Sequence, residues 1–233
     1  MSAAKLDWDP ASPHIRPIYR LAWTAMRIIS RTWFNWRVIG AEQVPVTGPV
    51  ILASNHVSFA DPPMIGSALP RAISYLARDT LFDQPGLGWF IRQLNAVPVD
   101  RDGGGAAGLK AILDRLHAGG GIILFPEGTR SRDGRLQSAR SGVGLTVIKS
   151  EAPVVPVRLF GMFEAWPRSR PLPLPGRVTV KFGRPLDFAA LRAEAKVCSK
   201  PRLKAIYQQV TDELMAEIGR LEPAEEVRRF PPR

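Results

Sequence analysis

The stretch SNHVSFADPP, residues 54–63, holds the side chains of this sequence that are best suited to proton transfer. His56 is one of only three histidines, and Asp61 follows it by five positions and precedes two prolines. A straight helix would set these side chains about 140° apart, and a straight strand would put them on opposite faces. They can meet only if the chain turns between them. Asp61 before Pro62 predicts that turn, because an aspartate N-cap followed by proline is a typical helix start.

The His56 and Asp61 pair has two interpretations. In the first, Asp61 accepts a hydrogen bond from one ring nitrogen, and the other ring nitrogen takes a proton from an attacking hydroxyl. In the second, Asp61 only caps a helix and His56 is incidental; geometry alone leaves both open. Ser58 could complete a Ser-His-Asp triad, but the glycine-flanked elbow of such a nucleophile is absent, which favours a backbone hydrogen bond in the turn.

A second polar cluster, FPEGTRSRDGRLQSARSG, follows the apolar segment GIIL at 121–124. Gly128 allows the backbone to approach a ligand closely. Arg130 can hold a phosphate through two parallel hydrogen bonds, and Thr129 can add a hydroxyl. A solvated basic loop is the alternative, but a position directly after a buried strand favours a binding loop. The neighbourhood is made more cationic by Arg132, Arg135 and Arg140.

Alternating strands and helices are expected to position both clusters. The pattern predicts a strand and a turn at 36–45, and strands at 48–54, 72–78, 95–101, 121–124, 153–161 and 177–183. It predicts a short helix with a turn in it at 81–94, and helices at 103–120, 141–152 and 201–221. Such alternation predicts an α/β fold with a mixed, largely parallel central sheet flanked by helices. We expect an N-terminal segment at 1–36, an α/β domain at 37–221 and a C-terminal tail at 222–233.

Residues 16–37 contain five arginines and no acidic residue. On a helix, Arg16, Arg20, Arg27 and Arg31 fall within about 60° of one another, and most of the apolar residues occupy the other side. This composition is typical of an amphipathic helix on an anionic membrane surface. The alternative is an ordinary docking helix with a solvated charged face.

The composition indicates the kind of partner and the cellular compartment of the protein. A net charge of +11 indicates a polyanionic partner, such as an anionic membrane surface, nucleic acid or phosphorylated substrates. Nucleic acid is not supported, because no helix-turn-helix, zinc finger or stacking-sheet motif accompanies the charge. The single cysteine, Cys198, excludes an internal disulfide, no Cys/His cluster suggests a metal, and a reducing compartment fits best. No apolar run reaches the roughly 20 residues of a membrane span.

Taken together, four blocks resemble the glycerolipid acyltransferases, specifically the bacterial 1-acyl-glycerol-3-phosphate acyltransferase type. NHVSFAD at 55–61 is similar to the family's His-x-x-x-x-Asp block, and FPEGTRS at 125–131 is similar to its third block. Residues 77–101 and 154–161 resemble the second and fourth blocks. The combination favours the catalytic interpretation of His56 and Asp61. The resemblance covers about residues 37–183.

The resemblance implies acyl transfer from a thioester, acyl-CoA or acyl-carrier protein, to the free sn-2 hydroxyl of a lysophospholipid acceptor, 1-acyl-glycerol-3-phosphate. It makes His56 the general base and Asp61 its orienter, with no metal, bound cofactor or covalent acyl-enzyme. Arg140 replaces the lysine that is frequent in the family, which exchanges an ammonium for a planar fork. The residues implied in substrate binding are Arg78, Arg101, Glu127, Gly128, Thr129, Arg130 and Arg140 for the head group, and Val155 and Pro156 at the acyl end.

We also expect a place at the cytoplasmic face of the cell membrane, peripheral or monotopic, because the family's N-terminal helices rest on the membrane. Two other functions are considered. One keeps the chemistry and changes the acceptor to another lysophospholipid or a lipid-linked amino acid. The other is a non-catalytic basic protein that binds membrane or nucleic acid.

Overall fold

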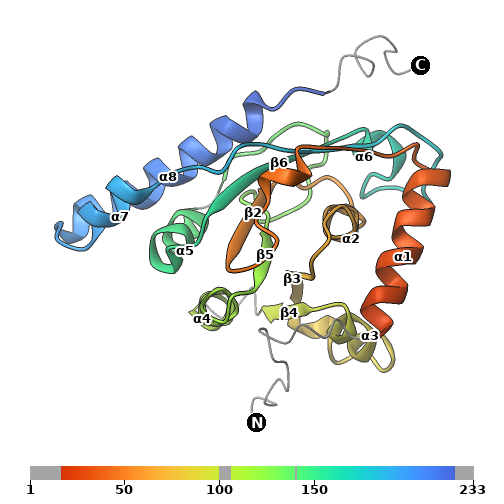
Figure 1. Ribbon diagram of the computed structural model, residues 1–233, viewed down its shortest axis with the longest axis horizontal. Coiled ribbons are helices and arrows are strands. Elements are labelled where there is room, and N and C mark those ends of the chain that lie inside the picture. Colours follow the sequence, from red (N-terminus) through yellow and green to blue (C-terminus); the bar gives the residue numbers. More distant parts are fainter. Residues whose placement is uncertain (1–16, 100–105, 140, 224–233) are drawn as a thin grey trace.

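A computed structural model of the chain describes residues 17–99, 106–139 and 141–223 (Figure 1). Within these residues, seven strands alternate with helices. The strands are β1 (Arg37–Ile39), β2 (Val50–Ser54), β3 (Ile73–Arg78), β4 (Ala96–Val99), β5 (Gly121–Leu124), β6 (Val154–Phe160) and β7 (Thr179–Phe182). The helices are α1 (Pro17–Thr32), α2 (Asp61–Ser67), α3 (Leu87–Gln93), α4 (Ala106–His117), α5 (Gly142–Ser150), α6 (Met162–Ala165), α7 (Ala189–Ala195) and α8 (Lys200–Arg220), with 3-10 turns η1 (Ala41–Gln43) and η2 (Asp79–Leu81).

The strands form one sheet in the order β1-β7-β6-β2-β5-β3-β4. Every pairing is parallel except that of β6 with β7, which is antiparallel. The predicted α/β fold with a mixed, largely parallel sheet is therefore confirmed. The short helices α6 and α7 were not predicted.

Alternate residues of the central strands point into two cores, one on each face of the sheet. Leu52 of β2 belongs to the core beneath α2 and α6, and its neighbour Ile51 belongs to the core beneath α4, α5 and α8. Both side chains are fully buried, as expected for a strand covered on both faces. Figure 1 shows the two layers, with α1 and α2 on one side of the sheet and α4, α5 and α8 on the other.

Parallel pairing brings the carboxyl ends of several strands to one edge of the sheet. Ala53 of β2 lies beside Leu124 of β5, so the loops that follow these strands begin side by side. β3 pairs in parallel with β5 and also ends at this edge. In open α/β sheets, ligands bind outside the carboxyl ends of the strands. The two polar clusters of the sequence therefore meet where a ligand site is expected.

The predicted helix at 16–37 is present as α1, which ends at Thr32. Polar contacts help to attach it to the rest of the chain: Trp23 Nε1 donates to the Leu69 carbonyl, Arg27 donates to the Ser67 carbonyl, and the hydroxyl of Ser30 lies 3.0 Å from the sulfur of Met64. Arg27, expected to meet lipid head groups, is instead held against the C-terminal end of α2. Arg16 lies outside the described residues.

Candidate active site

The turn between β2 and α2 brings His56 and Asp61 into contact, as the sequence predicted. His56 Nδ1 lies 2.8 Å from Asp61 Oδ2. The Asp61 side chain is fully buried, while that of His56 is 14% exposed. If Nδ1 donates its hydrogen to this carboxylate, Nε2 is the ring nitrogen that can accept a proton. The Phe125 ring stacks on the imidazole, with centroids 3.9 Å apart, and holds its plane.

Asp61 does not cap α2 in the way that the sequence suggested. Asp61 is the first residue of the helix, the N-cap is Ala60, and no side chain caps the helix by a hydrogen bond. Its Oδ2 atom instead accepts from the amides of Val57 at 2.6 Å and Ser58 at 2.8 Å, both in the turn before the helix. The prediction of an N-capping aspartate is therefore wrong, because the turn folds its own amides onto the carboxylate before the helix begins.

Ser58 is fully buried, and its hydroxyl accepts a hydrogen bond from the amide of Ala60 at 3.3 Å. This is the local turn bond that the sequence favoured over a nucleophilic role. A short turn within the His56 to Asp61 segment thus positions the carboxylate.

The segment 125–131, here called the EGTR loop, forms hydrogen bonds with both the backbone amide and the backbone carbonyl of His56. The His56 amide donates to Glu127 Oε1 at 3.1 Å, and the Ser131 amide donates to the His56 carbonyl at 2.7 Å. The other carboxylate oxygen of Glu127 accepts from the Gln137 amide at 3.2 Å. These bonds join the two clusters, although about seventy residues separate them in the sequence.

Glu127 is buried, with 3% of its surface exposed. Burial raises the pKa of Glu127 to about 7; the amides of His56 and Gln137 act in the opposite direction, and the charges of Asp61 and Asp133 raise the pKa further. The carboxylate faces backbone amides of the protein. Its predicted contact with a head group stays a prediction.

Beyond Glu127, the EGTR loop turns outward. Gly128 adopts a φ of 68°, a left-handed conformation that favours glycine, and its amide bonds the Phe125 carbonyl at 2.9 Å. Thr129 is exposed at the tip of this turn. The guanidinium carbon of Arg130 lies 3.4 Å from the ring centroid of Phe59, a residue of the His56 to Asp61 turn. A cation thereby lies over the turn that holds His56.

The remaining predicted site residues fall in three places. Arg78 ends β3 at the same edge of the sheet and is exposed. Val155 and Pro156 lie inside β6, buried beside Leu52 and Ala53 of β2. Arg101 and Arg140 lie outside the described residues.

Asn55 was not identified from the sequence. Its side-chain amide donates to the Leu159 carbonyl at 3.2 Å, and its side-chain oxygen accepts from the Leu159 amide at 2.8 Å. This pair of hydrogen bonds ties the start of the turn to the end of β6. A polar residue directly before the histidine was the available signal in the sequence, but its partner 104 residues away could not be read from it.

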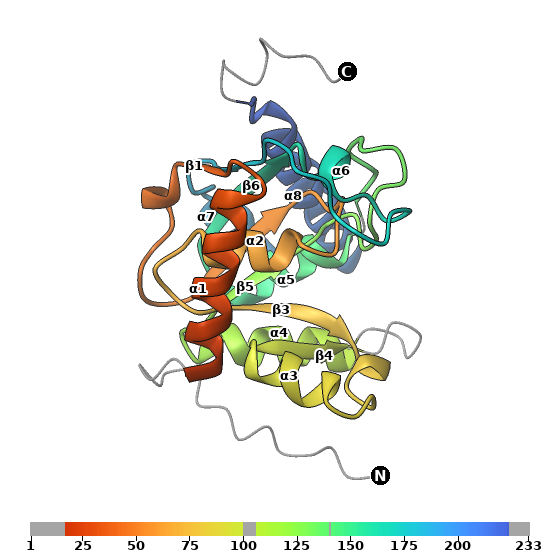
Figure 2. The same ribbon diagram turned by 90° about the vertical axis from the view of Figure 1, so that its right-hand side faces the viewer.

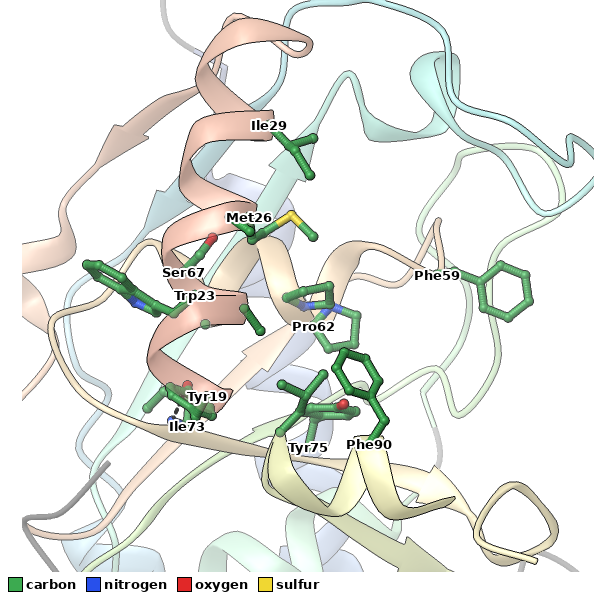
Figure 3. Close-up of a pocket in the computed structure, with 15 residues that line it drawn as sticks. Tyr19, Trp23, Met26, Ile29, Phe59, Pro62, Ser67, Ile73, Tyr75 and Phe90 are labelled. Atoms are coloured by element: carbon green, nitrogen blue, oxygen red, sulfur yellow. Dashed lines mark hydrogen bonds between the residues drawn. The ribbon is translucent and has the colours of Figure 1, made fainter. Parts of the chain in front are cut away.

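An apolar groove of about 410 Å³ opens beside the turn (Figure 3). Its walls come from α1 and α3, and its floor from α2 and β3. Phe59 lines the groove, and its ring also stacks with the guanidinium of Arg130, so the groove and the cation share one side chain. The lining residues are Tyr19, Ala22, Trp23, Ala25, Met26, Ile29, Phe59, Pro62, Pro63, Gly66, Ser67, Ile73, Tyr75, Phe90 and Leu94.

Comparisons with known proteins show which family and which fold this chain resembles. The sequence profile of the Acyltransferase family matches residues 35–159. A 1-acyl-sn-glycerol-3-phosphate acyltransferase of Bacillus subtilis is 29% identical over 84% of this chain and 95% of its own length. The chloroplastic 1-acyl-sn-glycerol-3-phosphate acyltransferase LPAT1 of Arabidopsis thaliana is 29% identical over 70% of this chain, which spans less than half (46%) of that relative.

Among solved structures, the crystal structure of the 1-acyl-sn-glycerophosphate acyltransferase PlsC from Thermotoga maritima matches with a TM-score of 0.65 and 26% identity. The match covers 90% of this chain and 81% of the other. The fold is thus that of a known acyltransferase. Since the family profile extends over more than half of the sequence, from β1 through the His56 turn and the EGTR loop into β6, this chain belongs to the Acyltransferase family.

Proposed function

We propose that this protein transfers a fatty acyl group from a thioester donor, acyl-CoA or acyl-carrier protein, to the sn-2 hydroxyl of 1-acyl-glycerol-3-phosphate, giving phosphatidic acid. The observation that carries the proposal is the buried Asp61 carboxylate 2.8 Å from His56 Nδ1, which leaves Nε2 as the base. The activities for which the Bacillus subtilis and Thermotoga maritima relatives are named support the choice of acceptor.

In the proposed reaction, His56 Nε2 takes the proton of the acceptor hydroxyl as its oxygen attacks the thioester carbonyl carbon. Asp61 stabilises the imidazolium that forms. The tetrahedral intermediate then collapses, the carbon–sulfur bond breaks, and the proton passes from His56 to the departing thiolate. The products are the new ester and a free thiol, and no acyl group is attached to the protein.

The phosphate of the acceptor is proposed to bind Arg130, whose planar fork suits two parallel hydrogen bonds. Its stacking on Phe59 supports this, because the ring fixes the guanidinium beside the base. Arg78, at the same sheet edge, is the second described cation proposed to face the phosphate. The groove next to Phe59 is proposed to receive an acyl chain, since its lining is almost wholly apolar.

We further propose that the chain acts at the cytoplasmic face of the membrane, as a peripheral or monotopic protein. Leu21 and Ile28 on the outer side of α1 are 71% and 58% exposed, and Arg20 and Arg31 flank them. This arrangement suits an interfacial helix on anionic lipid. Among the described helices, none has the length and apolar character of a transmembrane span.

The test is an assay of purified full-length protein with lysophosphatidic acid and either acyl-CoA or acyl-carrier protein, following thiol release and phosphatidic acid. His56→Ala is expected to fold and bind vesicles but to lose nearly all transfer. His117→Ala is the matched control, because His117 is exposed at the end of α4, on the opposite face of the sheet. Full activity of His56→Ala would exclude the proposed base.

The same assay with a panel of acceptors separates the alternatives. A preference for another lysophospholipid or a lipid-linked amino acid would keep His56 as the base and would assign Arg130 and Arg78 to a different head group. No transfer to any acceptor from any thioester would favour the non-catalytic alternative.

A further inference from the structure

Helix α3 exposes three of its four large apolar residues and buries its only glycine. Trp89 is 57% exposed, Phe90 42% and Leu87 39%. The one buried residue of the helix is Gly88. This is the reverse of the usual surface helix, whose apolar stripe faces the core. Exposed apolar clusters of this kind mark interaction surfaces.

The position of α3 is fixed from its inner side. A Cβ atom on Gly88 would lie 2.2 Å from the Phe82 carbonyl oxygen, so the helix packs directly on the backbone that precedes it. The guanidinium carbon of Arg92 lies 4.8 Å from the ring centroid of Phe82, which is itself buried. The exposed side chains therefore stand on a rigid base and are not the result of a loosely held segment.

The outer sides of α3 and α1 belong to one face of the molecule. In Figure 2 this face is turned to the viewer, with α1 above and α3 below. The apolar groove lies between the two helices: Met26 of α1 and Phe90 of α3 both line it, and Figure 3 shows them on either side of Pro62. A flat partner that covered both helices would lie across the mouth of the groove.

The two helices differ in charge. α1 carries exposed Arg20 and Arg31 and no acidic residue, whereas the segment leading into α3 contains the exposed carboxylates Asp79 and Asp83. Contact through α1 should thus depend on anionic lipid and on salt. Contact through α3 should rest on Leu87 and Trp89, and should depend neither on anionic lipid nor on salt.

We propose that α3 is a second bilayer-contacting element, inserted through Leu87 and Trp89, and that α1 and α3 together hold the mouth of the groove against the lipid surface. The occupant is a bilayer because the apolar surface continues into a helix whose cations lack balancing acids. Tryptophan is also the residue favoured at the membrane interface. This inference concerns binding only and does not depend on the proposed acyl transfer.

The first test is sedimentation of the full chain with vesicles of phosphatidylcholine containing or lacking phosphatidylglycerol. Leu87→Ser combined with Trp89→Ser is expected to weaken partitioning about tenfold on both kinds of vesicle, because two apolar side chains no longer insert. Arg20→Gln combined with Arg31→Gln should weaken it only on the anionic vesicles at low salt. Val197→Ser is the matched control, since Val197 is 86% exposed in the turn between α7 and α8, which Figure 1 shows at the far end of the molecule.

The second test places an environment-sensitive fluorophore on single cysteines in a Cys198→Ser background. A label on Trp89→Cys should shift to the blue on vesicle addition, and a label on Val197→Cys should not. Partitioning of the serine double variant within twofold of the original chain would overturn the proposal, as would an unshifted label at position 89. A dimer that the double variant abolishes, with vesicle binding unchanged, would assign the surface to a second copy of the chain. Equal thermal melting of all variants excludes misfolding as the cause.

Discussion

The most direct perturbation of the proposed mechanism is Asp61→Asn. The asparagine side chain has the same shape, and its single oxygen can still accept from the amides of Val57 and Ser58 and from His56 Nδ1. The tautomer of His56 is therefore retained. What is lost is the negative charge beside the ring, and with it the attraction to the imidazolium formed during transfer.

The size of this loss follows from the geometry. Two unit charges about 4 Å apart attract by about 4 kcal/mol at an effective dielectric constant of about 20. The Nδ1 to Oδ2 distance of 2.8 Å and the complete burial of Asp61 give no reason for a weaker interaction. About 4 kcal/mol of transition-state stabilisation corresponds to a fall in kcat of about 10³-fold. The unfolding free energy should change far less, since the backbone bonds are retained.

The assay is thiol release at saturating substrates, with urea unfolding measured on the same preparations. Asp187→Asn is the control, because Asp187 accepts from the amide of Ala189 at 2.8 Å at an exposed position away from His56. Asp61→Ala should lose both activity and stability, because it leaves two buried amides without an acceptor, at about 1–3 kcal/mol each. A folded Asp61→Asn variant that keeps more than about a tenth of wild-type kcat would refute the charge argument.

Three further outcomes are expected. Burial raises the pKa of Glu127 to about 7 from an ordinary value of 4.5, so its contribution to stability is full below pH 4.5 and is lost as pH rises through about 7. Glu127→Gln, which cannot titrate, should remove this part of the pH dependence in urea unfolding at pH 5 and pH 8; an unchanged dependence would contradict it. Arg130→Lys removes the fork and the stacking on Phe59, and should raise KM for lysophosphatidic acid about tenfold with a smaller change in kcat, whereas an equal KM would reassign the phosphate site. Asn55→Ala leaves the buried amide and carbonyl of Leu159 without their side-chain partner, and should lower the unfolding free energy by about 2 kcal/mol or more, measured by thermal unfolding.

The sequence was sufficient for the fold class and for the contact between His56 and Asp61. Strand periodicity and Gly/Pro punctuation are local signals, and a spacing that fits neither helix nor strand requires a turn. β3, β5 and β6 were predicted to within one residue at each end. These features depend on neighbours in the sequence, which is why they could be read from it.

Other parts of the site depend on long-range pairing. The bond from the His56 amide to Glu127 exists because β2 and β5 are neighbours in the sheet, and strand order cannot be read from periodicity. The same holds for Asn55 and Leu159. The assignment of Asp61 as a helix cap failed for a different reason. An aspartate before proline can serve either the helix that follows or the turn that precedes it, and only the folded backbone decides which amides reach it.

The surface of α1 and α3 shows that a hydrophobic pattern alone does not tell which partner covers an apolar face. The pattern of α1 separates apolar residues from arginines, but a protein core and a lipid surface both accept an apolar face. In the structure α1 is attached partly through the polar groups of Trp23, Arg27 and Ser30, while Leu21 and Ile28 stay exposed. In α3, apolar side chains also face outward, in this case because Gly88 packs closely on the backbone that precedes the helix. Two unrelated attachments leave apolar side chains outward on one face, and the proposed contact with a lipid surface would account for both.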